Sequence, residues 1–281
     1  MNDLLFWLPV MLAGGLAGAS SGIMGVYIMG MRMPFLGVFI AHAALAGAVF
    51  GALAGLTGEA LLAPALVAAL LGALALGLLG PERARMDSNV VLGVLFSLSM
   101  GLSFLGIGLF SVYGRSDNEV RNLLWGSLNF CRWRDVRLMA LITALVLCFV
   151  LLLGKEMRAI MFCRLQASAA GIHTTLVWTG FLVLTSAVLT VNFQTVGGLM
   201  IYSLLSSPAL VAFQLVRGHG RALAVSAATG AGCGVGGFVI AAMADLPTGA
   251  TTVILASALV GAAALLRNRA GRSRAAAPAA Q

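Results

Sequence analysis

The chain has 281 residues, of which 60% are hydrophobic and only 9% are charged. Soluble domains carry about 25% charged residues, so this composition excludes a water-covered surface and predicts a chain embedded in a lipid bilayer. The net charge of +8 does not indicate nucleic-acid binding, because the basic residues gather in short breaks between apolar segments.

Apolar segments follow one another along most of the chain. A helix needs about 20 apolar residues to cross a bilayer. Nine candidate segments lie at residues 5–29, 35–55, 60–79, 90–112, 138–154, 174–193, 196–216, 222–243 and 248–267. We therefore predict an all-α, polytopic transmembrane bundle over residues 1–267, with nine spans, or eight if one weak segment does not cross. Residues 268–281 are basic and low in complexity, which predicts a disordered cytoplasmic tail.

The distribution of Lys and Arg predicts the orientation. With the amino terminus outside, the inner loops and tail hold twelve basic and three acidic residues, whereas the outer loops hold five basic and six acidic ones. We therefore expect a multi-pass protein of a bacterial-type inner (cell) membrane, with a cytoplasmic carboxyl terminus. Residues 113–137 fit less well, because they hold all five outer arginines; a re-entrant or interfacial helix there is one interpretation.

Small residues and a proline mark two of the segments. Gly14, Gly18 and Gly22 recur every four residues in the first segment and predict a face where another helix packs closely. Pro208 lies inside the seventh segment, where it is expected to kink the helix. Such breaks in membrane helices often lie along substrate routes.

Polar residues within or beside the spans are candidates for a transport path. His42 lies inside the second segment, where an ionisable side chain is costly. Neutral imidazole is a common ligand of transition metals, although a membrane histidine can also simply bond a carbonyl. Asn192 and Gln194 stand at the predicted turn between the sixth and seventh segments. Asp245, in the last outer turn, either attracts cations or caps the final helix.

The inner loop at residues 162–172 differs from the other breaks. It predicts a short amphipathic helix containing Phe162, Arg164 and Ala167 that ends near Gly171. Such a helix either docks into a groove of a partner protein or is a plain connector. The chain has no G-x-x-x-x-G-K-[ST] phosphate loop. If ATP drives this protein, another chain must bind and hydrolyse it, so this chain is not expected to be an enzyme.

Four stretches resemble motifs of the permease family of metal-ion ABC importers, and the likeness covers nearly the whole chain. They are Phe35-Leu36-Gly37 through His42-Ala43, similar to F-L-G-D-x-x-x-H-A; Phe162 through Gly171, similar to F-D-x-x-x-A-x-x-x-G; Gln194 through Pro208-Ala209, similar to Q-x-V-G-x-L followed by L-x-x-P-A; and Asp245 through Ala250, similar to D-x-P-x-G-A. Two positions depart from these motifs. Val38 stands in place of the aspartate, and Cys163 replaces the acid of the loop motif.

This resemblance implies a homodimeric permease in the lipid bilayer that imports a divalent transition-metal ion, zinc first, with manganese or iron possible. It implies two ABC ATPase subunits docked on the cytoplasmic side at residues 162–172, and an extracytoplasmic metal-binding protein. It places His42 on the metal path as a transient ligand. The metal is then cargo, and no cofactor is bound by the chain itself. Because valine cannot ligate a metal, the absent aspartate makes manganese, which prefers oxygen ligands, a poorer fit.

Three alternatives remain open from the sequence. An ion-coupled secondary transporter needs intramembrane acids, and no Asp or Glu lies well inside a predicted span. A membrane enzyme needs clustered catalytic groups, whereas only His42 is expected inside the bilayer. A permease for a metal chelate or siderophore is the third alternative, and the valine at position 38 favours it.

Overall fold

The computed structural model describes residues 2–79, 87–114 and 131–276. These residues form α-helices and one 3-10 helix, and no strand is found among them. The long helices coincide with the apolar runs, as expected for segments that must satisfy their own backbone hydrogen bonds in lipid. The all-α prediction is confirmed. The elements are α1 (Asn2–Gly30), α2 (Phe35–Leu53), η1 (Gly58–Leu61), α3 (Leu62–Leu79), α4 (Ser88–Val112), α6 (Trp133–Phe162), α7 (Arg164–Ala169), α8 (Thr174–Val196), α9 (Gly198–Leu215), α10 (His219–Ala244) and α11 (Thr248–Ala276).

Eight helices in the described part of the chain are long and apolar enough to cross a membrane. Each of the nine predicted segments corresponds to a helix, and α9, with 18 residues, is as long as α3. The prediction of eight or nine spans therefore agrees with the helices. Residues 115–130, the larger part of the segment interpreted as re-entrant, lie outside the described residues.

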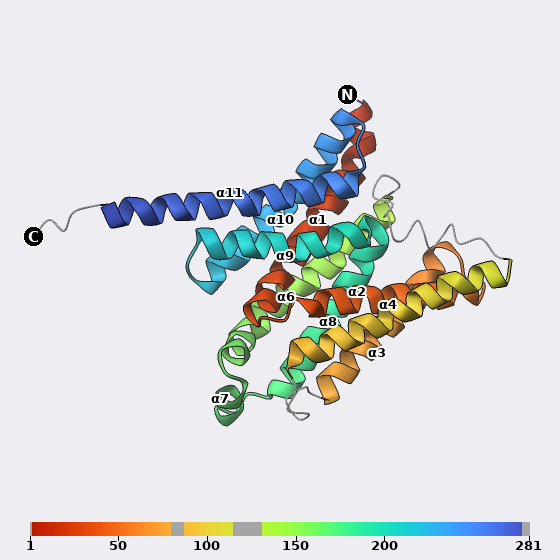
Figure 1. Ribbon diagram of the computed structural model, residues 1–281, viewed down its shortest axis with the longest axis horizontal. Helices are drawn as coiled ribbons and strands as arrows, with labels where there is room; N and C mark the ends of the chain where they lie inside the picture. Colours follow the sequence, from red (N-terminus) through yellow and green to blue (C-terminus); the bar gives the residue numbers. More distant parts are fainter. Residues whose placement is uncertain (1, 80–86, 115–130, 277–281) are drawn as a thin grey trace, which may run out of the picture.

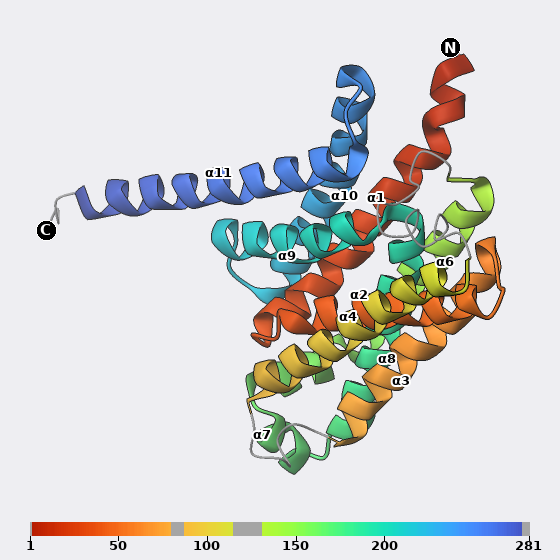
Figure 2. The ribbon, with the colours of Figure 1, turned by 45° about the vertical axis from the view of Figure 1, so that its right-hand side comes forward.

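Two groups of helices pack around α1 and α8. α1 packs against α10, α9 and α6, while α2 packs against α3 and α4, and α8 contacts α3 and α6. α7 lies at one extremity of the molecule (Figure 1), which we call the α7 end. α11 packs on α9 and α10 and then extends away from the other helices (Figures 1 and 2). It continues to Ala276, so the tail expected from residue 268 begins as part of this helix.

The glycines of α1 form its contact with α10. A Cβ atom on each would press against the α10 backbone; the facing pairs are Gly14 with Gly234, Gly18 with Gly230, and Gly22 with Ser226. The Ser226 hydroxyl donates a hydrogen bond to the Gly22 carbonyl at 2.7 Å. The two backbones therefore touch along more than two helical turns, which only small side chains permit.

The break in the α8–α9 region lies at a glycine and not at the proline. α9 runs without interruption from Gly198 to Leu215 with Pro208 inside it. Gly197 separates α8 from α9 with φ of 95°, a backbone conformation that favours glycine. Gly197 thus separates the two helices, while α9 continues through Pro208, where the expected kink stays a prediction.

Candidate functional site

His42 is half-buried on α2, and its ring is oriented by the helix itself. Its Nδ1 lies 2.9 Å from the carbonyl oxygen of Val38, one turn earlier. Because a carbonyl only accepts hydrogen bonds, Nδ1 must carry the hydrogen in this contact. In the neutral ring, Nε2 then keeps a free lone pair that can accept a hydrogen bond or bind a metal. The Val38 side chain takes no part, but its carbonyl does.

The remaining contacts of His42 come from α4. Its ring meets Phe96 edge-on, with centroids 4.9 Å apart. The hydroxyl of Ser103 donates to the Ser99 carbonyl at 2.8 Å and lies 3.5 Å from the His42 carbonyl. Ser99 and Ser103 are both buried. The imidazole therefore contacts α4 through Phe96, while the His42 backbone carbonyl lies near the Ser103 hydroxyl.

Asn192 lies in a different helix contact from His42. It is 1% exposed, inside α8 and not in a turn. Its amide nitrogen donates to the hydroxyls of Ser21 at 3.0 Å and Ser20 at 3.1 Å, both on α1. These bonds join α8 to α1, whereas the contacts of the His42 ring lie on α2 and α4. The sequence prediction missed the two serines, because hydroxyls in an apolar helix give no signal of their own.

Gln194 and Asp245 also differ from their expected settings. Gln194 belongs to the last turn of α8, and its buried amide nitrogen has no hydrogen-bond partner in the described part of the chain. Asp245 is exposed and ends α10 in the left-handed conformation, with φ of 53°. It thus terminates the helix before it. The two roles expected of Asp245, attracting cations and capping the final helix, stay predictions.

The short helix α7 forms from the predicted loop and has two different faces. Ala167 is buried, so a larger side chain there would disturb the packing of α7 itself. Gly171 has φ of 85°, and the next amide, of Ile172, bonds back to Ala167 at 3.1 Å. Gly171 thus ends the helix in the left-handed backbone conformation, which strongly favours glycine even though no other group crowds the position. Phe162 and Leu165, by contrast, are 86% and 82% exposed, and Leu165 was not among the predicted site residues.

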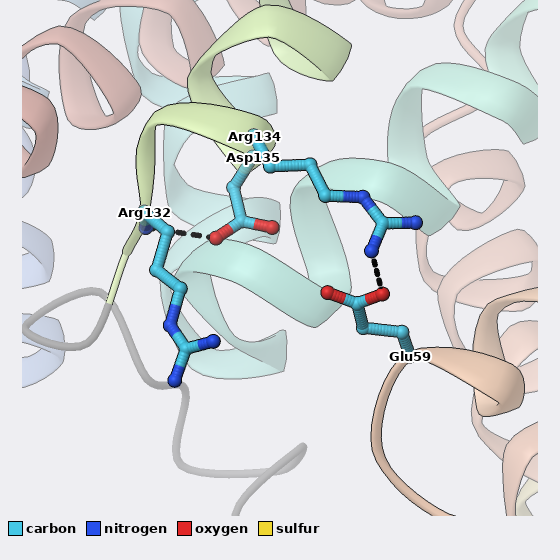
Figure 3. Close-up of polar contacts among 4 residues, drawn as sticks. All are labelled: Glu59, Arg132, Arg134 and Asp135. Atoms are coloured by element: carbon cyan, nitrogen blue, oxygen red, sulfur yellow. Dashed lines mark hydrogen bonds and ion pairs between the residues drawn. The ribbon is translucent and has the colours of Figure 1, made fainter.

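Charged residues at the other end of α6 join it to the α2–α3 connection. Arg134 forms an ion pair with Glu59 of η1, and the Asp135 carboxylate accepts from the Arg132 backbone at 2.9 Å (Figure 3). The latter bond caps α6. Burial, and then the Asp135 carboxylate, raise the pKa of the nearby Cys131 thiol to about 12. Cys131 therefore remains a thiol at neutral pH.

No group of three or more His, Cys, Asp or Glu side chains that could hold a metal is found within the described ranges. The protein instead offers a single oriented imidazole within a bundle of eight candidate spans, and a short helix with exposed apolar side chains at one end. This combination fits a membrane transport subunit. The chain belongs to the ABC 3 transport family, whose sequence profile matches residues 3–267.

Relatives and solved structures agree with this membership. The chain is 24% identical to the manganese transport system membrane protein MntC of Listeria monocytogenes, over 85% of this chain and 83% of the relative. It is 27% identical to the chelated iron transport system membrane protein YfeD of Yersinia pestis, over 94% of this chain and 86% of the relative. The structure titled PsaBC from Streptococcus pneumoniae in complex with Fab has the same fold, with a TM-score of 0.79 and 22% identity over 93% of each chain.

Proposed function

We propose that residues 1–267 form the permease subunit of an ATP-driven importer for a divalent transition-metal ion. The observation that carries the proposal is His42, held by the Val38 carbonyl with Nε2 free. Metal-binding histidines commonly donate their other ring N–H to a carbonyl or carboxylate. Val38 therefore supplies through its backbone the orienting contact that a carboxylate would otherwise provide.

The chemistry of His42 favours zinc as cargo, since imidazole suits zinc whereas manganese prefers oxygen ligands. The names of the relatives instead favour manganese or iron. A lone neutral ligand binds an ion weakly, which suits passage rather than storage. A homodimer would bring a second copy of His42 to the membrane, and an extracytoplasmic binding protein would deliver the metal to the outer surface near the exposed Asp245.

The α7 end is the surface we assign to the ATPase. A helix of six residues with exposed Leu165 within it and exposed Phe162 just before it matches the way short helices dock into a groove of a partner. Placing this end in the cytoplasm agrees with the excess of Lys and Arg there. With nine spans, a reporter fused after Arg274 should then report a cytoplasmic location and one at Asp3 an external one; the reverse result would remove the ATPase assignment.

Changing Leu165 to Asp should separate the chain from its ATPase. The substitution puts a charge into an apolar contact, and we expect ATPase co-purification and metal uptake to fall by about tenfold or more, as for a central interface residue. Leu246→Asp is the matched control, because Leu246 is an exposed leucine in the α10–α11 connection. Normal co-purification of Leu165→Asp would show that α7 is only a connector.

The function itself is tested with proteoliposomes that hold this chain, its ATPase and its binding protein. We expect these proteoliposomes to take up radiolabelled zinc, manganese or iron only when ATP is supplied to the ATPase. The purified chain alone should hydrolyse no ATP. Uptake driven by a proton or sodium gradient without ATP would instead indicate a secondary transporter. Uptake of iron only as a chelate would support the chelate permease, the alternative that the name of the YfeD relative favours.

A further inference from the structure

Tyr27 lies where four helices meet, close to the α7 end of α1. Its side chain is fully buried. Its ring contacts His219 of α10 edge-on, with centroids 5.1 Å apart, and Phe181 of α8, with centroids 5.7 Å apart. A Cβ atom on Gly154 of α6 would lie 3.5 Å from the Tyr27 hydroxyl oxygen. One side chain therefore touches α10 and α8 and faces α6.

The polar atoms of Tyr27 and His219 are buried without a hydrogen bond. The tyrosine Oη and the histidine Nε2 both lack a partner within the residues that the structure describes. A phenol hydroxyl donates one hydrogen bond and an unprotonated imidazole nitrogen accepts one. The two atoms are thus complementary, and their rings already touch. Leaving both unbonded is costly in a buried setting.

The helices around Tyr27 are joined most directly in two pairs, α1 with α10 and α6 with α8. α1 and α10 touch backbone to backbone through their glycines, so they are expected to move as one body. α6 and α8 are joined by α7 through short connections, and they contact each other through Phe149 and Phe181, with centroids 6.1 Å apart. A displacement of α7 therefore reaches Tyr27 through Phe181 and through the α6 backbone at Gly154.

We propose that the Tyr27 hydroxyl donates a hydrogen bond to His219 Nε2 in a second conformation of the transport cycle, reached when α7, α6 and α8 shift against the α1–α10 pair. This inference rests on the proposed function, because it assigns the shift to the ATPase that docks on α7. Tyr27 and His219 are then positioning residues that favour the second conformation, and neither needs to touch the metal.

The test compares Tyr27→Phe with Tyr113→Phe, a matched control at the exposed end of α4. Phenylalanine keeps the ring but removes the hydroxyl. In the conformation described above, the variant therefore no longer buries an unbonded hydroxyl. In the second conformation, it cannot form the hydrogen bond to His219. In the complete complex we expect metal uptake to fall by about tenfold, whereas the detergent-solubilised chain melts at the same or a higher temperature. Tyr113→Phe should change neither quantity.

The second part of the test is the double variant Tyr27→Phe with His219→Phe, compared with each single variant. When two residues act through one shared hydrogen bond, the effects of substituting them do not add. The double variant should therefore take up metal no more slowly than the less active of the two single variants. Additive losses, wild-type uptake by Tyr27→Phe, or a lower melting temperature of that variant would overturn the inference. An inactive wild-type complex would contradict the proposed function instead, and the melting temperature of Tyr27→Phe would still test the unbonded hydroxyl.

Discussion

Metal uptake should fall by more than about tenfold in His42→Ala, assayed in proteoliposomes that hold the complete complex, because the variant loses the oriented imidazole. The free Nε2 of His42 is the nitrogen that the Val38 contact leaves available. Alanine supplies no ligand in its place. The loss should appear with each metal that the wild-type complex transports.

Two further variants separate ligation from structure. His173→Ala changes an exposed histidine at the start of α8 and should leave uptake unchanged. Val38→Asp adds an oxygen ligand one turn from His42, and it should increase metal retention in the membrane fraction. Wild-type uptake by His42→Ala, with normal dimer assembly and ATPase docking, would make His42 a structural residue and leave the cargo route unassigned.

Gly230→Ala should strongly destabilise the protein. The new methyl group would overlap the carbonyl of Gly18 on α1, and a backbone atom cannot move aside as a flexible side chain can. Overpacking of this kind costs about 1–3 kcal/mol or more, so we expect the melting temperature in detergent to fall by about 5 °C or more. The yield of folded chain should fall with it.

Gly232→Ala is the matched control on the same helix. A Cβ atom on Gly232 meets nothing within 4 Å, and alanine is the better helix former, so its melting temperature should be unchanged or slightly higher. Gly18→Ala should repeat the loss from the opposite helix, since its Cβ would overlap Gly230. Equal melting temperatures for Gly230→Ala and Gly232→Ala would show that the α1–α10 contact is looser than the structure indicates.

The sequence by itself determined the fold class and the positions of the helices. Long apolar runs leave few alternatives, since a segment in lipid must bond its own backbone and therefore becomes helical. The same reasoning placed a short helix after Phe162 and its end near Gly171. It could not decide between eight and nine spans, because length and composition alone do not show whether an apolar helix crosses the bilayer.

Only the tertiary structure decided which residues meet. Periodicity places Gly18 on a face but does not show that Gly230 lies opposite, and it gave no reason to select Ser20 and Ser21 as the partners of Asn192. It also gave no sign that the Val38 backbone carbonyl orients His42, because a sequence displays side chains and not backbone contacts. Contacts between two helices depend on how each helix is rotated about its own axis. Many residues determine that rotation together, so no short motif predicts it.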